Sequence, residues 1–476
     1  MIPVRSYPGA RLGVLGLGRS GLATARALAA GDAVPICWDD GEGARAEAEA
    51  AGFEVADLSR PREAAGLARL IVSPGVPHLY PSPHPAVAAA IEAGVPLDND
   101  VGLFFQAVGA TGAEVRVVAI TGSNGKSTTT ALVAHLLSKA GRPVQMGGNI
   151  GRAVLDLDPP ADGETVVLEL SSYQIELARA LAPDIAVFLN LSPDHLDRHG
   201  GMGGYFAAKR RLFEAGAPER QIIGVDDAPG RFLANRVMEP DDAESASLIE
   251  IATLRKLRGE GWSVFMNRRF LTEWRAGRQV AAVDLAPARA LQGAHNHQNA
   301  CAAWAVARAC GLGPRVIEAG LLSFPGLAHR MERLGTVGGV LCVNDSKATN
   351  ADAAEKALLA YEHVRWILGG RAKEGGIAAL VPLFDRIAGA YLIGEAAETF
   401  GQTLGSVTQR QCATLDAAVD AALAEAQPGE VLLLSPAAAS WDQFASFEAR
   451  GEAFRALLEA RGLVPEGAIE GGEGAA

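Results

Sequence analysis

Apolar residues recur along the chain at two alternating spacings. Short runs rich in β-branched residues, such as 115–120 and 165–170, are of strand length, and segments between such runs carry apolar residues at helical spacing. Strands that alternate with helices in this way predict parallel sheets covered by helices, so we expect an α/β fold. Residues 250–285 differ because polar and apolar positions alternate between turn signals, which predicts β-hairpins added to a sheet.

The length of the chain indicates more than one domain. Its 476 residues exceed what one core accommodates at roughly 100–200 residues per domain. We expect a Rossmann-like domain at 1–108, a central P-loop mononucleotide-binding α/β domain at 109–326 and a C-terminal Rossmann-like domain at 327–476. The third domain is expected to contain a second parallel doubly wound sheet. The segment that begins with Pro325-Gly326 ends at Arg330. Such a segment is typical of a hinge that brings a cation to a phosphate.

The strongest chemical signal is a strand, a glycine-punctuated turn and a helix at 115–141. Unpaired backbone N–H groups converge at such a helix start and bind phosphate, while Lys126 supplies a cation and Ser127 a hydroxyl for Mg²⁺. The turn is shorter than G-x-x-x-x-G-K-[ST], because Ile120 stands where the first glycine belongs. An ordinary strand-to-helix turn is the alternative. The predicted loop comprises Thr121, Gly122, Ser123, Asn124, Gly125, Lys126 and Ser127.

A second glycine loop follows the strand predicted at 11–15. It reads G-x-G-x-x-G from Gly16 to Gly21, and Asp39 ends the next strand about where an acid that binds ribose is expected. The loop suits a dinucleotide or a nucleotide-diphosphate sugar equally, and glycines needed only for packing are the structural alternative. A third strand ends near Gly75, so three strand ends are expected to line one crevice.

Two polar residues of the central domain stand where ligands are expected to bind. Glu169 lies inside an apolar strand, where a carboxylate is costly unless it is paired or bound to metal. A metal is the better interpretation beside a magnesium-nucleotide loop, and a salt bridge is the alternative. His195 follows the strand at 185–190, at the edge where open α/β sheets bind ligands, although a lone histidine is more often structural.

Lys209 is the least expected residue of the central domain. It lies three residues after Phe206 and four before Phe213, so the helical pattern puts it on the apolar face. Burial would lower its pKa and leave free amine, and we hypothesise that this amine takes up CO₂ to form a carbamate suited to Mg²⁺. The pattern alone favours the alternative, a lysine that extends to solvent.

Two amides, Asn296 and Asn299, stand where an alanine-rich helix begins. Asparagine is a good helix cap, which is the structural interpretation. Amides before a helix can also contact a purine or hold a phosphate, so both roles stay open.

Composition and charge narrow the class of protein. The net charge of −12 argues against a nucleic-acid binder, which needs a basic face. The five cysteines show no C-x-x-C pairing, so we expect reduced core residues and neither a disulfide framework nor a zinc site. Because we find no signal segment and no apolar run long enough to cross a bilayer, we expect a cytoplasmic protein, and a monomer as the default.

In this order, the motifs TGSNGKST, ELSSYQ, DHLDRHG, GAHNHQN, HRME, NDSKATN, LGG and LSPAAASWDQFASFEARGEAF resemble those of the Mur ligase family along nearly the whole chain. Within that family, the first domain and the NDSKATN and SPxxAS-x-DQF stretches are most similar to the subgroup that adds D-glutamate to UDP-N-acetylmuramoyl-L-alanine in peptidoglycan synthesis. The D-N-P-R stretch of the members that add diaminopimelate or lysine is absent, and NGK replaces the HGK of the alanine-adding member.

The resemblance implies a role for each domain: the first binds the UDP-sugar, the central one ATP and the third the amino acid. The catalytic residues would be Lys126, His195 and Lys209. Residue by residue, it implies UDP-sugar contacts at Gly18, Asp39, Gly75 and Asn149, and metal binding for two Mg²⁺ at Ser127, Glu169, His195 and carbamylated Lys209. It further implies nucleotide contacts at Asn296, Asn299, Arg330 and Asp345, and D-glutamate contacts at Thr349, Lys373, Ser440 and Phe447. Ala438 stands where the subgroup often has cysteine, and Trp441 fills a variable position beside Ser440.

The implied reaction activates a carboxylate by phosphorylation, because oxide is not a leaving group. The L-alanyl carboxylate would attack the γ-phosphate, and D-glutamate would then attack the acyl phosphate. Two other classes remain open. A nucleotide-gated binding protein would use the loop without ligation, and a dehydrogenase would bind NAD in the first domain but leave the GKS loop unexplained.

Overall fold

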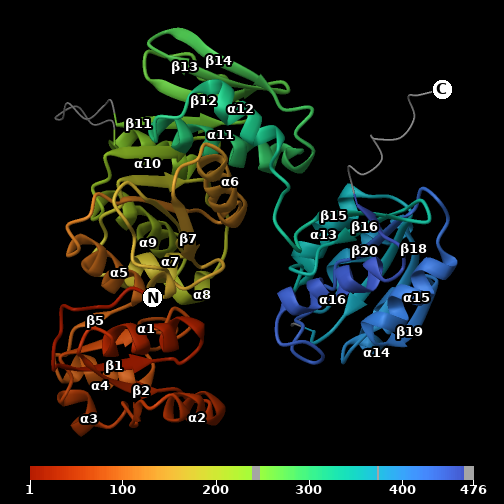
Figure 1. Cartoon of the computed structure of the whole chain (residues 1–476). Helices are drawn as coiled ribbons and strands as arrows, with labels where there is room; N and C mark the ends of the chain where they lie inside the picture. The colour runs from red at the N-terminus through yellow and green to blue at the C-terminus, as the bar shows by residue number, and fades with distance from the viewer. Residues whose placement is uncertain (238–246, 373–374, 466–476) are drawn as a thin grey trace. The chain divides into compact units, whose positions relative to one another are not determined.

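The computed structural model describes residues 1–237, 247–372 and 375–465. The chain forms two compact units, Met1–Pro325 and Gly326–Ala476. The first unit contains two sheets and the second contains one, each a sheet with helices packed against it (Figure 1). The α/β class with parallel sheets is therefore confirmed, whereas the boundary expected near residue 108 stays a prediction.

The first sheet has five parallel strands in the order β3-β2-β1-β4-β5. The order reverses beside β1, which is the point where open α/β sheets bind ligands. The strands are β1 (Arg11–Leu15), β2 (Val34–Trp38), β3 (Glu54–Val55), β4 (Arg69–Val72) and β5 (Leu97–Asp98). The helices are α1 (Arg19–Ala29), α2 (Glu42–Ala50), α3 (Pro61–Ala65), α4 (Pro85–Glu92) and α5 (Asp100–Gly109).

The second sheet has nine strands in the order β14-β13-β12-β11-β10-β9-β6-β8-β7. The strands are parallel from β7 to β12, and the predicted hairpins extend that sheet through the antiparallel strands β13 and β14. The strands are β6 (Arg116–Thr121), β7 (Val144–Gly148), β8 (Thr165–Glu169), β9 (Ile185–Phe188), β10 (Arg220–Gly224), β11 (Leu248–Ala252), β12 (Trp262–Asn267), β13 (Phe270–Arg275) and β14 (Arg278–Asp284). The helices are α6 (Lys126–Lys139), α7 (Ser172–Leu177), α8 (Leu196–His199), α9 (Met202–Glu214), α10 (Ala228–Val237), α11 (Ala294–Ala309) and α12 (Pro314–Leu322), with short 3₁₀ helices η1 (Val154–Asp156) and η3 (Arg289–Leu291).

Hydrophobic clusters join the helices of the first unit to its sheets, and two of them are large. One joins α6 and α11 to a face of the second sheet and includes Leu132 and Trp304, both fully buried. The other runs from Leu22 of α1 through Phe104 of α5 to Phe188 of β9, so it spans both sheets. The first two sheets therefore share a core.

The sheet of the second unit has the order β19-β18-β17-β20-β16-β15-β21. The strands are parallel as expected from β19 to β16, and the sheet departs from this at one edge, where β15 runs antiparallel to β16 and β21. The cause is a two-glycine turn, Gly338-Gly339, with φ values of +58° and +82° that join β15 and β16 as a hairpin. The strands are β15 (Glu332–Val337), β16 (Val340–Asn344), β17 (Val364–Gly369), β18 (Ile387–Ile393), β19 (Gln409–Ala413), β20 (Val431–Leu434) and β21 (Val464–Pro465). The helices are α13 (Ala351–Ala360), α14 (Ala397–Leu404), α15 (Leu415–Glu425) and α16 (Phe447–Glu459), with the 3₁₀ segment η4 (Ala378–Arg386).

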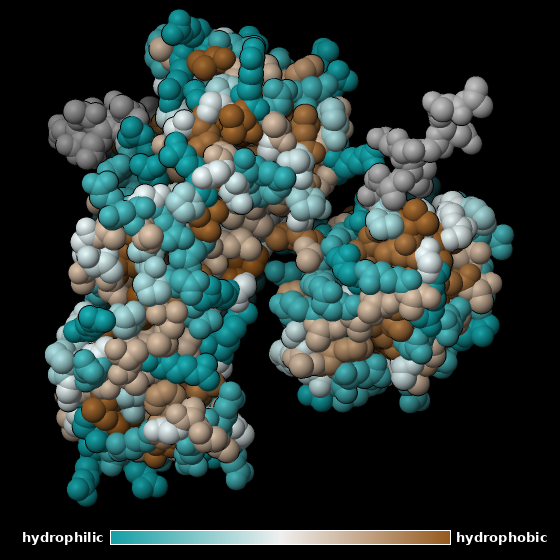
Figure 2. Space-filling model, viewed as in Figure 1, coloured by the Kyte–Doolittle hydropathy of each residue, from teal (hydrophilic) through white to brown (hydrophobic). Residues whose placement is uncertain are grey.

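The visible surface is mainly hydrophilic, with scattered hydrophobic patches (Figure 2). All five cysteines are free, and four are buried as expected, whereas Cys412 is only half-buried. Among the described residues, none of the helices combines the length and the apolar character that a bilayer crossing requires.

A buried ion pair fixes α11 to the added hairpin. The Glu273 carboxylate is fully buried and accepts hydrogen bonds from Trp304 Nε1 at 3.0 Å and Arg308 Nε at 2.8 Å. A carboxylate buried this deeply depends on its cation, because desolvation is otherwise uncompensated.

We expect Arg308→Met to destabilise the first unit by about 3 kcal/mol, because the buried carboxylate loses its hydrogen-bonded cation and keeps only Arg275, whose Nε lies 3.8 Å away. The exposed pair of Arg269 and Asp284 provides the control, since Arg269→Met should cost less than about 1 kcal/mol. Differential scanning calorimetry measures both variants, and equal shifts in melting temperature would contradict the role of burial.

Candidate active site

The phosphate loop connects β6 to α6, as the sequence predicted. Gly125 precedes the helix with φ +86°, and no side chain caps the helix N-terminus. A Cβ at Gly125 would lie 2.2 Å from Asn299 Oδ1, so no larger residue fits there. The loop therefore presents a helix start without a side-chain cap, which suits an anion.

The two residues after Gly125 carry the charge and the hydroxyl expected of this loop. Lys126 Nζ donates hydrogen bonds to the carbonyls of Gly122 at 3.0 Å and Ser123 at 2.8 Å, so the ammonium lies over the loop. Ser127 is the second residue of α6, and its side chain is largely buried. Both groups lie at the helix start that would bind phosphate.

The structure brings both predicted amides of α11 beside this loop. Asn299 Oδ1 accepts from Thr129 Oγ1 at 3.2 Å, and Asn299 Nδ2 donates to Asn296 Oδ1 at 3.2 Å. The helix begins at Ala294 after Gly293, whose φ is +89°. The capping interpretation is therefore wrong, because both amides lie inside the helix and not before it.

Glu169 ends β8 beside the loop, in register with Ile120 of β6 and Gly148 of β7. Its carboxylate is 2% exposed, and Oε1 accepts from Asn149 Nδ2 at 3.0 Å. Oε2 is buried and has no hydrogen-bond partner within the described part of the chain. The partner of Glu169 is thus a neutral amide and not the cation that the salt-bridge alternative requires.

A magnesium ion fits this oxygen. Mg²⁺ prefers oxygen ligands and is usually held by one or two carboxylates, substrate phosphates and waters. In residues 1–237, 247–372 and 375–465, no three His, Cys, Asp or Glu side chains are grouped to hold a metal. This is compatible with an ion that takes most of its ligands from a nucleotide.

Lys209 is buried inside the unit, so the alternative of a lysine that extends to solvent is wrong. Its side chain lies on α9, is 1% exposed and donates from Nζ to the Gly122 carbonyl at 2.9 Å. Burial, and then the nearby charge of Lys126, hold the pKa of Lys209 well below its ordinary value. The same buried amine therefore contacts the phosphate loop and is readily deprotonated.

His195 precedes α8 with φ +53°, and its half-exposed ring lies 3.3 Å from Asp194 Oδ2. Burial lowers its pKa below the ordinary value. Sequence reasoning missed Tyr173, whose ring lies 5.0 Å from the rings of both His195 and His199. No spacing distinguishes this tyrosine; only its place in the SSYQ stretch beside Glu169 marks it.

The ends of β1, β2 and β4 meet at the first glycine loop, as expected. Asp39 Oδ2 accepts from the Leu17 N–H at 2.7 Å, and Ser73 Oγ donates to the Gly16 carbonyl at 2.7 Å. Gly18 immediately precedes α1, whose N-terminus has no side-chain cap. The N-terminus of α1 therefore lies at this edge of the first sheet.

Gly75 joins that edge to the central sheet. Its carbonyl accepts from Arg198 Nη1 at 3.0 Å, three residues beyond His195. Sequence reasoning missed Arg198, because arginine contacts with a distant carbonyl leave no local pattern.

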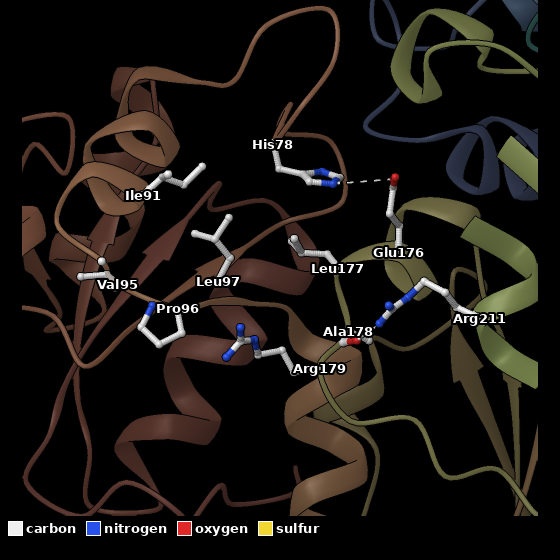
Figure 3. Close-up of a pocket in the computed structure, with 11 residues that line it drawn as sticks. His78, Ile91, Val95, Pro96, Leu97, Glu176, Leu177, Ala178, Arg179 and Arg211 are labelled. Carbon is white, nitrogen blue, oxygen red and sulfur yellow. Dashed lines mark hydrogen bonds and ion pairs between the residues drawn. The ribbon is translucent and has the colours of Figure 1, made fainter. Parts of the chain in front are cut away.

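A separate pocket of about 600 Å³ lies between the end of α4, β5 and α7 (Figure 3). His78 and Glu176 face each other at one end, with His78 Nε2 3.7 Å from Glu176 Oε2. None of the predicted site residues lines this pocket. The predicted sites therefore lie elsewhere.

The second unit carries the remaining predicted residues except Lys373, which lies outside the described residues. Asp345 is almost fully buried after β16 and accepts from Ser435 Oγ at 2.8 Å and from the Met331 N–H at 3.1 Å. Burial raises its pKa to about 7, against the weaker opposing effects of the hydrogen bonds from Ser435 and Met331 and of the Arg330 charge. Asp345 thus connects the ends of β16 and β20 to the segment around Met331, near the start of the second unit.

The predicted amino-acid site surrounds the same strand ends. Ser440 is buried after β20, Phe447 begins α16, and Thr349 lies just before α13. Ala438 is fully buried, whereas Trp441 is 70% exposed. Of the two departures noted in the sequence, Ala438 therefore lies inside the fold and Trp441 on its surface.

A phosphate loop with a buried carboxylate and lysine beside it defines a protein that binds a nucleoside triphosphate. Comparison with models of protein families identifies the family to which the chain belongs. Residues 120–307 match the Mur ligase middle domain, and residues 329–438 match the Mur ligase, glutamate ligase domain. The chain belongs to the Mur ligase family.

Curated relatives match over nearly the full length. The UDP-N-acetylmuramoylalanine–D-glutamate ligase of Cereibacter sphaeroides is 59% identical over 466 residues, covering 97% of this chain and 100% of the relative. The protein of the same name from Ruegeria pomeroyi is 58% identical over 469 residues, covering 97% and 99%.

Solved structures share the fold at low identity. The UDP-N-acetylmuramate-alanine ligase MurC of Thermotoga maritima has a TM-score of 0.58 at 16% identity, covering 95% of this chain and 99% of that one. FolC of E. coli in complex with DHPP and ADP has a TM-score of 0.54 at 18% identity, covering 76% and 93%.

We expect the pKa of Asp345 to make the second unit less stable as pH rises. The folded carboxyl titrates at about 7 and the unfolded one near 3.8, so the folded state binds more protons between these values. Stability from this group is full below the lower value and is lost as pH rises through the upper one. Thermal unfolding measured from pH 5.5 to 8 should show this slope, and Asp345→Asn should flatten it. An unchanged slope in the variant would contradict the assignment.

Proposed function

We propose that this protein joins D-glutamate to UDP-N-acetylmuramoyl-L-alanine in an ATP-dependent step of peptidoglycan synthesis. The observation that carries the proposal is the 59% identity to a UDP-N-acetylmuramoylalanine–D-glutamate ligase over 97% of the chain. The phosphate loop, with Glu169 and Lys209 buried beside it, supports the ATP-dependent part.

The chemistry proceeds in two transfers. A carboxylate oxygen of the L-alanyl group attacks the γ-phosphorus, the bond to the β-phosphate oxygen breaks, and ADP leaves with an acyl phosphate formed. The D-glutamate nitrogen then attacks the acyl carbon, phosphate leaves with the oxygen, and the amine loses a proton. Lys126 and the helix start at Gly125 stabilise the charge on the phosphates in the first transfer.

Other residues beside the phosphate loop bind the nucleotide and the metal ions. Asn296 and Asn299 contact the nucleotide, and Ser127, Glu169 and His195 hold two Mg²⁺ ions together with a modified Lys209. When bound, Mg²⁺ neutralises phosphate charge. The orphaned Oε2 of Glu169 supports this assignment.

The two other substrates use separate strand ends. Gly18, Asp39, Gly75 and Asn149 contact the UDP-sugar, and Arg330 and Asp345 also serve the nucleotide. Thr349, Lys373, Ser440 and Phe447 hold D-glutamate. The converging ends of β1, β2 and β4 support the UDP-sugar assignment.

The test is phosphate release with all three substrates. Release should require UDP-N-acetylmuramoyl-L-alanine, ATP and D-glutamate together, and L-glutamate should not substitute. Phosphate release that does not depend on the amino acid would instead favour a nucleotide-gated binding protein. NAD binding by the first domain, measured by fluorescence, would favour a dehydrogenase.

Lys126→Ala should lower kcat by at least about 10³-fold, because it removes a cation at the developing charge. UDP-sugar binding, followed by calorimetry, should stay close to that of the unaltered protein. Lys139→Ala at the far end of α6 is the control and should keep full activity. An active Lys126 variant would exclude the phosphate role.

We further propose that the Lys209 amine reacts with CO₂ to form a carbamate. Its burial and its lowered pKa support the proposal, because the neutral amine is the form that reacts. The new anion would supply two oxygens for Mg²⁺.

Carbon-13 NMR with labelled bicarbonate should show a carbamate signal that Lys209→Met lacks. Lys209→Ala should be inactive and partly restored by a small carboxylic acid. A plain amine under saturating bicarbonate would exclude the modification while leaving the ligase assignment in place.

We also propose that the protein acts in the cytoplasm as a monomer. Its five unpaired cysteines support a reducing compartment. Light scattering at micromolar concentration measures the oligomeric state.

A further inference from the structure

Arg450 is a buried arginine that no step above uses. It lies in the first turn of α16, three residues after Phe447, and it is 1% exposed. Removing a guanidinium from water is costly, so a fold keeps one inside only where its donors are satisfied.

Backbone and hydroxyl oxygens satisfy this guanidinium. Nε donates to Ser346 Oγ at 3.0 Å, Nη2 to the Ser346 carbonyl at 2.8 Å, and Nη1 to the Ala438 carbonyl at 3.1 Å. No carboxylate of the described residues forms an ion pair with it. Burial lowers its pKa to about 10, an effect that the negative charge of Asp442 partly opposes, so the cation persists at neutral pH.

These contacts join three segments that are distant in sequence. Ser346 follows β16, Ala438 follows β20, and Arg450 itself belongs to α16. Ser346 Oγ also donates to the Phe447 carbonyl at 2.8 Å, which closes the arrangement on the start of α16. The loop after β17 packs on it as well, because a Cβ at Gly370 would lie 3.3 Å from Arg450 Nη1.

The same segments carry the proposed amino-acid site. Thr349 lies three residues beyond Ser346, and Ser440 lies two beyond Ala438, while Phe447 shares the first turn of α16 with Arg450. One planar side chain therefore sets the spacing of the three segments on which these residues stand.

We propose that Arg450 is a positioning residue for D-glutamate, whose guanidinium holds these loops in register and adds a positive charge beside a dicarboxylate site. The proposal rests on the proposed function. Lysine cannot replace the arginine fully, because a single ammonium cannot direct donors to Ser346 and Ala438 in one plane. A neutral residue at position 450 would remove both the hydrogen bonds that hold the loops in register and the positive charge.

Two substitutions separate these contributions. Arg450→Met should raise the KM for D-glutamate by about tenfold or more, since loss of charged hydrogen bonds typically costs that much. Arg450→Lys keeps the charge and should give a smaller rise. The KM for UDP-N-acetylmuramoyl-L-alanine should change by less than about twofold in both variants, because its proposed contacts all lie in the first unit.

Arg365→Met is the matched control. Arg365 is also a largely buried arginine of this unit, but it pairs with Glu430 at 2.8 Å at the start of β17, away from the proposed site. The Arg365→Met variant should have a lower melting temperature than the unaltered protein but the same KM for D-glutamate. Circular dichroism and thermal unfolding establish that each variant is folded.

The outcomes distinguish the two proposals. If the unaltered protein releases no phosphate with D-glutamate, the proposed function fails. If it does, a folded Arg450→Met with an unchanged KM for D-glutamate overturns the positioning role alone. An equal rise in KM in Arg365→Met would also overturn it, because general destabilisation would then explain the effect. If Arg450→Met does not fold, Arg450→Lys decides, and an unchanged KM in that variant counts against the proposal.

Discussion

The close approach of the phosphate loop to α11 is the contact on which the first unit's site depends. Gly125 has no room for a Cβ because Asn299 Oδ1 already occupies that space. The start of α6 is thereby fixed against a second helix, and the shared core behind both helices keeps that distance constant. The loop can bind an anion with little rearrangement, because its backbone is already held in place.

Around this loop the fold retains polar groups that a purely structural core would avoid. Glu169 holds a buried oxygen without a partner, and Lys209 holds a buried amine on a loop carbonyl. Each lowers the stability of the ligand-free protein, and ligands that complete their contacts would recover that energy. In the second unit Arg450 differs, because its guanidinium already donates hydrogen bonds to Ser346 and Ala438 within the fold.

Sequence patterns predicted the elements that local signals specify. The strand, glycine loop and helix at 115–141 were predictable because glycine placement and helical spacing mark them directly. The hairpin of β15 and β16 was missed, although its Gly-Gly turn is a hairpin signal. Whether Lys209 is buried could not be decided from spacing, since a long side chain on an apolar face can still reach solvent. Arg450 was not found because its partners lie in segments far away in the sequence and arginine is seldom buried.

The hydrophobic cluster that runs from Leu22 through Phe104 to Phe188 has a consequence for dissecting the chain. A fragment that ends after α5 would expose to water the apolar side chains that now face the second sheet, and the remainder would expose the opposite face. Both pieces would be prone to self-association, whereas a cut near Pro325 follows the division into compact units. The two sheets of this half of the molecule therefore behave as one structural unit in any dissection of the chain.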